Sequence, residues 1–286
     1  MRWQGGRESG NVEDRRSARG RAGGIGGMSL GTVVVVVVAS WLLGVNPLTM
    51  LGLVGQIGQG VSQEEPAQSP PADDPQARFV ATVLASTEDV WSYIFQSEGQ
   101  RYAPPKLVLY RGTYPTACGV GQAAMGPFYC PGDQKVYIDL SFYDTLQNQL
   151  GAPGEFAQAY VIAHEVGHHV QKLLGISDQV DAQRRRLTER QYNALSVRVE
   201  LQADCFAGIW AHYTNQQTQM IEDGDLDSAL NAASKIGDDA LQSRSQGYVV
   251  PDSFTHGSSA QRVRWFRRGW DQGKVEACDT FSADNL

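Results

Sequence analysis

Three stretches of the chain place apolar residues at the spacing of a buried helix. Residues 156–174 mix periodic and continuous apolar positions, with Gly154 before their start and Gly175 placed to end a helix. Residues 195–210 repeat the helical pattern, and residues 258–270 do so with serines at the start that can cap a helix. Because polar side chains on mostly apolar helices are costly to bury without partners, the His and Glu residues of these stretches are the first candidates for chemistry.

Two shorter stretches, Leu107–Tyr110 and Lys135–Tyr143, have the pattern of strands. In the second, Val136, Ile138 and Leu140 alternate with other side chains, so one face is expected to be buried and the other more polar.

An uncharged, mostly apolar stretch at residues 30–54 has the length of a single bilayer crossing. Six arginines precede it, and a positive flank is typical of the cytoplasmic side. No cleavage site follows, which predicts an uncleaved single-pass anchor with residues 1–29 in the cytoplasm. Residues 55–76 are predicted to be a disordered linker, and residues 77–286 one domain outside the membrane, periplasmic or at the cell surface.

The net charge of −7 argues against nucleic acid as a partner. The four cysteines are an even number in a domain expected outside the cytoplasm, which predicts disulfides. Of the three possible pairings, Cys118–Cys130 with Cys205–Cys278 is favoured, because the first two bracket a short Gly-rich loop and the others lie farther apart. A second metal site is the alternative, but the chain has no C-x-x-C spacing.

Residues 164–168 form an H-E-x-x-H pattern within the first predicted helix. On a helix, His164 and His168 lie one turn apart on the same face, so both imidazoles can reach one metal ion. Glu165 between them is placed to accept a proton from a water that the metal activates. The pattern predicts one Zn²⁺ per chain with Glu165 as general base. The alternative is the exposed face of an ordinary helix.

A catalytic zinc needs a third protein ligand. The H-E-x-x-H-x-x-G-x-x-H extension is absent, because Gln171 and Leu174 occupy its Gly and His positions. Glu200 is the better candidate, since Glu200 and Asp204 lie one turn apart within an apolar helical pattern. His212 and Asp204 itself are rival third ligands, and both carboxylates could instead be solvated.

The spacing of Glu200 and Asp204 resembles the E-x-x-x-D arrangement of gluzincin-type peptidases. The resemblance implies that Glu200 ligates zinc, while Asp204 accepts a hydrogen bond from the far nitrogen of a ligating histidine and orients its ring. A peptidase of this kind also needs a donor for the developing oxyanion, and His256 is suited to that role. Arg262 could hold a carboxylate or support the histidine. The stretch from His256 to Arg262 also has the pattern of a capped helix start.

A wider resemblance rests on Met1–Trp3, Asn11–Arg16, Gly126–Pro131, Lys135–Leu140, His164–Gln171, the Glu200 and Asp204 pair, and His256–Arg262. In this order they resemble the bacterial neutral zinc metallopeptidase family (YpfJ-like proteins), which is itself zincin-like. The resemblance implies an α+β zincin-like fold, with a mixed sheet and the H-E-x-x-H helix. It also implies a membrane-anchored form and peptidase activity on a peptide or protein substrate.

In zincins an edge strand above the ligand helix pairs with the extended substrate backbone. Lys135–Ser141 is the candidate here, with an ordinary interior strand as the alternative. The predicted function is that of a membrane-anchored zinc metalloendopeptidase. Its rival is a zincin-shaped scaffold that binds envelope proteins or peptides with little turnover, although such a scaffold has no need of Glu165. A third hypothesis is a zinc hydrolase of a non-peptide amide. The sequence predicts neither the substrate nor the oligomeric state.

Overall fold

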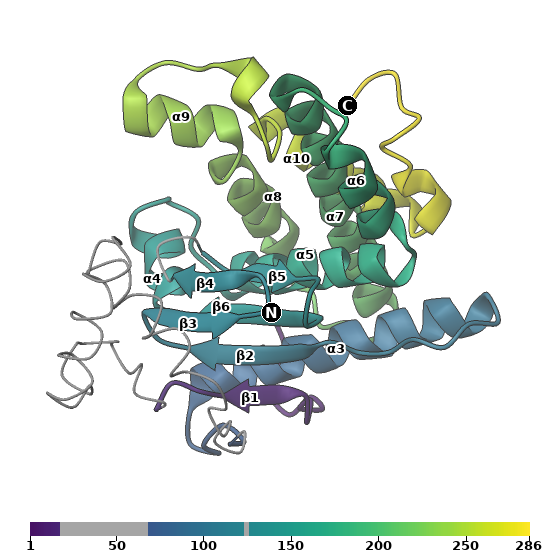
Figure 1. Cartoon of the computed structure of the whole chain (residues 1–286). Helices are drawn as coiled ribbons and strands as arrows, with labels where there is room; N and C mark the ends of the chain where they lie inside the picture. The colour runs from purple at the N-terminus through teal and green to yellow at the C-terminus, as the bar shows by residue number, and fades with distance from the viewer. Residues whose placement is uncertain (18–67, 123–125) are drawn as a thin grey trace, which may run out of the picture. The chain divides into compact units, whose positions relative to one another are not determined.

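The computed structural model describes residues 1–17, 68–122 and 126–286, of which Met1–Arg16 and Gln68–Leu286 form one compact unit (Figure 1). The described strands are β1 (Val12–Asp14), β2 (Lys106–Tyr110), β3 (Thr113–Thr116), β4 (Gly119–Gln122), β5 (Phe128–Cys130) and β6 (Lys135–Asp139). The described helices are α3 (Pro75–Ser97), α4 (Ser141–Asn148), α5 (Glu155–Leu173), α6 (Ile176–Arg184), α7 (Glu189–Thr218), α8 (Asp225–Lys235), α9 (Asp238–Gln246) and α10 (Ser259–Gln272). Two short 3-10 helices, η3 (Pro251–Ser253) and η4 (Val275–Cys278), flank α10.

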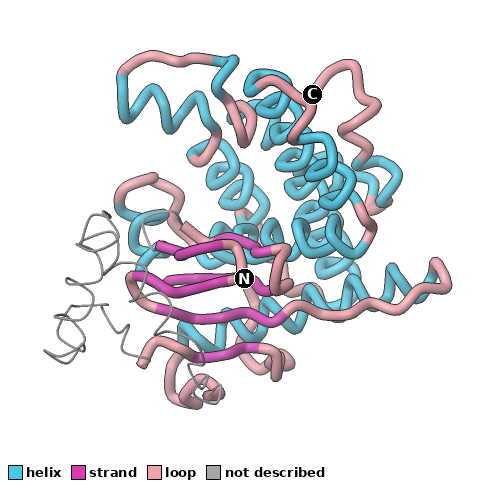
Figure 2. The backbone as a smooth tube through the Cα atoms, viewed as in Figure 1, coloured by secondary structure: helices cyan, strands magenta, loops and turns pink. Residues whose placement is uncertain are grey.

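Within the described residues, the main sheet has four strands in the order β1-β2-β6-β5 (Figure 2). β1, β2 and β6 run parallel, with Val12 opposite Leu107 and Leu107 opposite Val136. β5 runs antiparallel to β6 and lies at the edge, with Tyr129 opposite Val136. The protein therefore has a mixed α+β fold. The prediction of Lys135–Ser141 as the edge strand is wrong, because β6 lies between β2 and β5.

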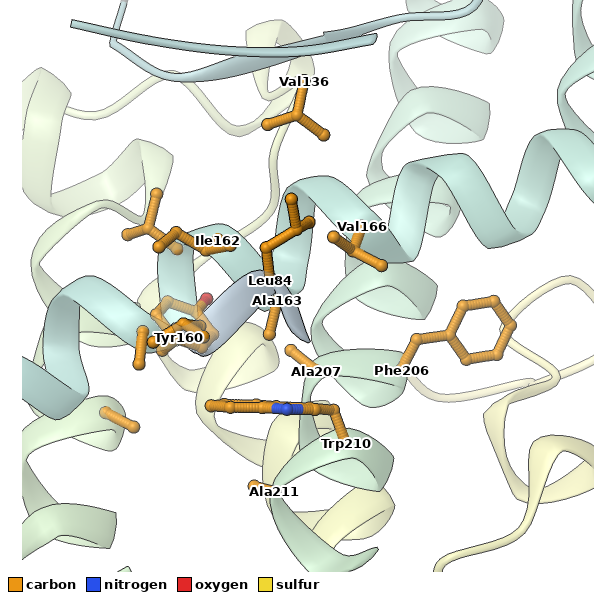
Figure 3. Close-up of a cluster of buried hydrophobic side chains, with 14 of the residues drawn as sticks. Leu84, Val136, Tyr160, Ile162, Ala163, Val166, Phe206, Ala207, Trp210 and Ala211 are labelled. Carbon is orange, nitrogen blue, oxygen red and sulfur yellow. The ribbon is translucent and has the colours of Figure 1, made fainter. Parts of the chain in front are cut away.

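Both faces of the sheet carry apolar side chains. On one face Val136 belongs to the main core, and Figure 3 shows it on one side of α5 with Trp210 of α7 on the other. On the opposite face Tyr137 is only 2% exposed. Tyr114 of β3 contacts its ring, and Phe128 of β5 stacks on it with 5.0 Å between centroids. The expectation of a more polar second face is wrong, because the β3–β4 hairpin and β5 supply an aromatic cluster there.

Two disulfides join parts of this fold, Cys118–Cys130 and Cys205–Cys278, and the predicted pairing is confirmed. The first ties the β3–β4 hairpin to β5. The second ties the C-terminal segment to α7. Each disulfide restricts the unfolded chain. For closed loops of these lengths, this adds on the order of 3–4 kcal/mol to the free energy of unfolding.

Glycines at their crossing allow α7 and α10 to pack closely. A Cβ atom on Gly208 would overlap the carbonyl oxygen of Phe266, and one on Gly269 would overlap that of Cys205. Any larger residue at either position would push the two helices apart. Toward the start of α10, which Ser258 caps, Arg262 reaches Asp204 in the middle of α7.

The prediction of a zincin-like domain preceded by a transmembrane helix needs correction. Across residues 1–17, 68–122 and 126–286, no helix combines the length and the apolar character needed to cross a membrane. The predicted anchor at residues 30–54 and residues 55–67 of the predicted linker lie outside the described residues.

The predicted single-pass topology is wrong because the start of the chain folds with the domain. β1 pairs with β2 in the main sheet. Trp3 packs edge-on against Phe79 of α3, and its indole N–H donates to Glu155 of α5 at 2.9 Å. Segments that share one sheet and one core lie on the same side of any membrane. The chain therefore cannot have a cytoplasmic N-terminal segment and an external domain, as the predicted localisation required.

Candidate metal centre and active site

The H-E-x-x-H residues lie on α5, which crosses α7 at close range. Glu155 in the first turn and Lys172 in the last turn match the helix dipole, so the sequence favours this helix at both ends. At the crossing, a Cβ atom on Gly167 would lie 3.0 Å from the carbonyl oxygen of Ala203. Gly167 thus permits a close approach, and the polar side chains of the two helices meet at this point.

Two histidines of α5 and one glutamate of α7 form a group that could hold one metal ion. His164 Nε2 lies 3.2 Å from Glu200 Oε2, and His168 Nε2 lies 3.5 Å from Glu200 Oε1. One ligand atom from each residue lies within 4.8 Å of the other two. His164 is buried, whereas His168 and Glu200 are partly exposed, so one side of the group is accessible.

Hydrogen bonds on the far side of each ring determine which nitrogen is free. His164 Nδ1 donates to Asp204 at 2.8 Å, and His168 Nδ1 donates to Gln171 Oε1 at 2.9 Å. Each neutral ring then carries its lone pair on Nε2, and both lone pairs face the carboxylate of Glu200. Three acceptors that face one another require a cation between them. Two imidazoles and one carboxylate are a donor set that suits Zn²⁺.

When no metal is bound, the same group attracts protons. Burial by itself lowers the pKa of His164, but Asp204 and Glu200 outweigh it and raise that pKa to about 10. Burial also lowers the pKa of His168, but the charge of Glu200 outweighs this effect and raises that pKa above its ordinary value. The pKa of Glu200 is held well below its ordinary value, because the two histidines outweigh the effect of burial. This electrostatic demand for positive charge is what a divalent cation would satisfy.

Asp204 lies behind His164 in a fully buried network. Its oxygens accept hydrogen bonds from the Tyr160 hydroxyl at 2.5 Å, from His164, and from Arg262 Nε and Nη2 at 2.8 and 2.9 Å. Burial by itself raises the pKa of Asp204, but the charges of Arg262 and His164 outweigh it and hold that pKa at about 2. The carboxylate is therefore ionised at neutral pH and holds the His164 ring in one orientation.

Replacing Arg262 by Leu is expected to lower the free energy of unfolding by about 3–5 kcal/mol, because Asp204 would remain buried without its bidentate partner. Urea unfolding at neutral pH measures the loss. Arg267→Leu on the exposed side of α10 is the matched control and should stay within about 0.5 kcal/mol of the wild type. Equal stability of the two variants would refute the structural role of Arg262.

The loss of stability caused by Arg262→Leu should depend on pH. In the wild type, the lowered pKa of Asp204 stabilises the fold fully above the ordinary value of 3.8, and this stabilisation disappears as the pH falls through about 2. Without Arg262 the main cause of the low pKa is gone, so acid removes less stability from the variant than from the wild type. The difference in unfolding free energy should therefore be smaller near pH 3 than near neutral pH.

Glu165 follows His164 on α5 and is 7% exposed. Burial raises its pKa above the ordinary carboxyl value, and the neighbouring histidines oppose this only in part. A carboxylate with a raised pKa takes up a proton more readily than a solvated one, which suits a general base.

The loop before α10 carries His256, and Asp238 at the start of α9 holds this loop. Asp238 Oδ2 accepts the backbone N–H groups of Thr255, His256 and Gly257 at 2.8, 2.6 and 3.0 Å. Its other oxygen lies 3.3 Å from His256 Nδ1. The carboxylate thus fixes both the backbone and the ring of His256.

The His256 side chain is 51% exposed, and its Nδ1 lies against Asp238, so its Nε2 points away from that carboxylate. The hydrogen bond with Asp238 is the main cause that raises the pKa of His256, and the charge of Glu200 raises it further. The adjacent Gly257 packs against Leu201, the neighbour of Glu200 in the sequence. Because the charges of His256 and Glu200 act on each other, this exposed donor lies near the metal-holding group.

The rival third ligands are engaged elsewhere. His212 Nδ1 donates to the carbonyl oxygen of Trp270 at 2.6 Å, and Gln216 lies 2.8 Å from its other nitrogen. Asp204 contacts Nδ1 of His164, whereas Nε2 of the same ring faces Glu200. The structure thus brings Glu200, and neither rival, to the accessible side of the two histidines.

Three residues of this region were missed by sequence reasoning: Tyr160, Gln171 and Asp238. Tyr160 and Gln171 lie about one turn from the two histidines on the same helix, so helical spacing was a usable signal for both. Asp238 holds its histidine from 18 residues away, and no local pattern marks it.

The edge strand beside α5 is β5 (Figure 1). The Tyr129 hydroxyl of β5 donates to His169 Nδ1 at 3.0 Å, while His169 Nε2 donates to the carbonyl oxygen of Ala103 at 2.7 Å. Burial lowers the pKa of His169, which favours the neutral ring that can make both bonds. His169 therefore anchors the edge strand to the helix that carries the metal-holding histidines.

Comparisons with known proteins agree with this site. A family model described as "Putative neutral zinc metallopeptidase" matches residues 1–281. The protein YpfJ of Escherichia coli K12 is 54% identical over 292 residues, which cover 98% of this chain and 99% of YpfJ. Rv2575 of Mycobacterium tuberculosis H37Rv is 40% identical over 221 residues, which cover 74% of this chain and 72% of Rv2575. No solved structure matches the chain.

The family match spans nearly the whole chain, and the family name implies Zn²⁺ and a peptide or protein substrate. The group of His164, His168 and Glu200 supplies the ligands that one such ion would need. On these grounds the chain belongs to the neutral zinc metallopeptidase family.

Proposed function

We propose that this protein hydrolyses peptide bonds, with His164, His168 and Glu200 as zinc ligands and Glu165 as general base. The observation that carries the proposal is the pair of Nε2 lone pairs that face the Glu200 carboxylate, an arrangement that needs a cation. Zinc held there would lower the pKa of a water molecule toward ~7 and polarise the carbonyl of the substrate.

Glu165 would take the proton of the attacking water and pass it to the leaving amine. Its burial and raised pKa support this role, since the group must hold a proton between the two steps. No covalent intermediate is needed, because the water itself is the nucleophile.

Asp204, Tyr160 and Arg262 would act through His164. The hydrogen bond from His164 Nδ1 to Asp204 leaves Nε2 free for the metal. Arg262 keeps Asp204 ionised, and Tyr160 donates to the same carboxylate. Their effect on the reaction would come from the orientation of one ring, without contact with the substrate.

His256 would donate a hydrogen bond to the oxyanion that develops on the substrate carbonyl. Its ring is half-exposed, Asp238 holds its Nδ1 side, and its raised pKa favours a protonated donor. A donor held in place before the reaction needs no reorganisation as the charge develops.

The substrate backbone would pair with the edge of β5 opposite β6, where the described residues place no other strand. β6 occupies the other edge of β5, and Tyr129 fastens the strand to α5. An extended peptide that adds to such an edge gains main-chain hydrogen bonds with little dependence on its side chains. This supports an endopeptidase that acts on unfolded segments.

The test is cleavage of an unfolded protein by the purified chain, before and after a chelator removes the metal. Cleavage should stop on chelation and return when one equivalent of zinc is added. Zinc binding without any cleavage would reject the peptidase and favour a scaffold that binds peptides.

A further inference from the structure

Gln171 is a fully buried polar residue on α5, one turn after His168. Its Oε1 lies 2.9 Å from His168 Nδ1. Its Nε2 lies 2.7 Å from the carbonyl oxygen of Val199 and 3.0 Å from Gln202 Oε1. The side chain thus links a proposed zinc ligand on α5 to the backbone and a side chain of α7.

Main-chain carbonyls determine the orientation of both amides in this chain of hydrogen bonds. A carbonyl oxygen can only accept, so the Gln171 atom beside Val199 must be the NH₂ group. By the same rule, the Gln202 atom that lies 3.0 Å from the carbonyl oxygen of Cys278 is its NH₂ group. Gln202 Oε1 therefore faces Gln171 Nε2, and Gln171 Oε1 is left to face His168.

The tautomer of His168 follows from that orientation. Because Gln171 Oε1 can only accept, His168 Nδ1 must carry the hydrogen, and the lone pair lies on Nε2, toward Glu200. We infer that Gln171 is a positioning residue that sets the ring orientation and tautomer of His168, and that Gln202 and the Cys278 carbonyl set Gln171 in turn. The inference rests on the proposed zinc site.

The far end of this relay is anchored to α7. Cys278 is joined to Cys205 by a disulfide. Arg198 donates to the carbonyl oxygens of Thr280, Phe281 and Ala283, which hold the segment that follows. The residue whose carbonyl orients Gln202 is therefore held by a covalent bond, and the partly buried Arg198 holds the segment that follows it.

The two histidines of the group are thus held in different ways. His164 is oriented by the ionised Asp204, which needs Arg262 to balance its charge. His168 is oriented by a neutral amide, which brings no charge and needs only hydrogen-bond partners. The neutral relay orients the second ring without adding another buried carboxylate beside Glu200.

Two substitutions of Gln171 separate positioning from packing. Gln171→Leu removes both the acceptor for His168 and the donor to Val199. Gln171→Glu disturbs the donor side in a similar way but keeps an oxygen opposite His168. We expect the zinc Kd of Gln171→Leu to rise about 10–100-fold and that of Gln171→Glu to stay near the wild type. Thr214→Val removes the buried hydrogen bond between Thr214 of α7 and Ser86 of α3, and is the matched control with unchanged zinc affinity.

Zinc affinity is measured on the full chain by competition with a chelator. In the zinc-loaded protein, the His168 Nδ1 proton should also give a resonance protected from exchange in the wild type and in Gln171→Glu, but not in Gln171→Leu. If Gln171→Leu does not fold, Gln202→Leu takes its place and should weaken zinc binding less, in the same direction.

Equal zinc affinity and equal protection of the proton in all variants would overturn the inference and leave the proposed zinc site standing. A folded wild type that binds no zinc would reject the proposed function, and the inference with it.

Discussion

Replacing Glu165 by Gln is expected to leave zinc binding intact and to lower kcat/KM for peptide hydrolysis by about 10²–10⁴-fold. The amide has nearly the volume of the carboxylate, so the buried position on α5 should stay packed. It cannot take up a proton, however, and the attacking water would lose its base. Zinc content and initial rates on an unfolded protein, measured on the same preparation, give both results.

Glu155→Gln is the matched control for this experiment, because Glu155 is an exposed glutamate at the start of the same helix. A glutamine there can still accept the hydrogen bond from Trp3, so wild-type rates are expected. Wild-type turnover by zinc-loaded Glu165→Gln would show that another group is the base. Loss of zinc together with activity would instead make Glu165 a ligand.

Replacing Glu200 by Ala is expected to remove tight zinc binding and the stability that zinc adds to the fold. A ligand present at 100 times its Kd stabilises the state that binds it by about 2.7 kcal/mol. The wild type should show a gain of this size in unfolding free energy when zinc is added, and Glu200→Ala should show almost none. Urea unfolding with and without zinc, beside zinc content, measures the difference.

Glu189→Ala, in the exposed first turn of the same helix, is the control and should behave as the wild type. Zinc retained at full strength by Glu200→Ala would mean that a different side chain is the third ligand. Without the carboxylate, His168 would also lose the main cause of its raised pKa, and His164 would keep only the effect of Asp204. Their protons should then leave nearer to neutral pH in the variant than in the metal-free wild type.

The residues of the metal-holding group could be chosen from the sequence because each pair belongs to one helix. His164 and His168 share a face of α5 by spacing alone, and so do Glu200 and Asp204 on α7. That the two pairs meet depends on Gly167, whose missing side chain lets the helices cross closely. The sequence shows this glycine but does not show what lies against it.

Two predictions failed for a related reason. β1 has only three residues, and its partner β2 lies about ninety positions later, so no local pattern reveals that the start of the chain belongs to the domain. Lys135–Ser141 has the alternation of an exposed strand, but β5 and the hairpin cover it. Strand order depends on long-range pairing. Alternating apolar and polar residues along a strand cannot distinguish an edge strand from an interior strand whose second face is covered by aromatic rings.

By itself, the sequence determined the three helices that carry the site, the H-E-x-x-H and E-x-x-x-D spacings, and a favoured pairing of the four cysteines. These follow from periodicity and separation along the chain, which act before any tertiary contact forms. Only the tertiary structure decided that Glu200 rather than His212 meets the histidines, that Asp238 holds His256, and that Gln171 and Gln202 orient His168. Each of these depends on helix crossings and hydrogen bonds between distant segments, where the packing of the whole core determines which side chains come within reach.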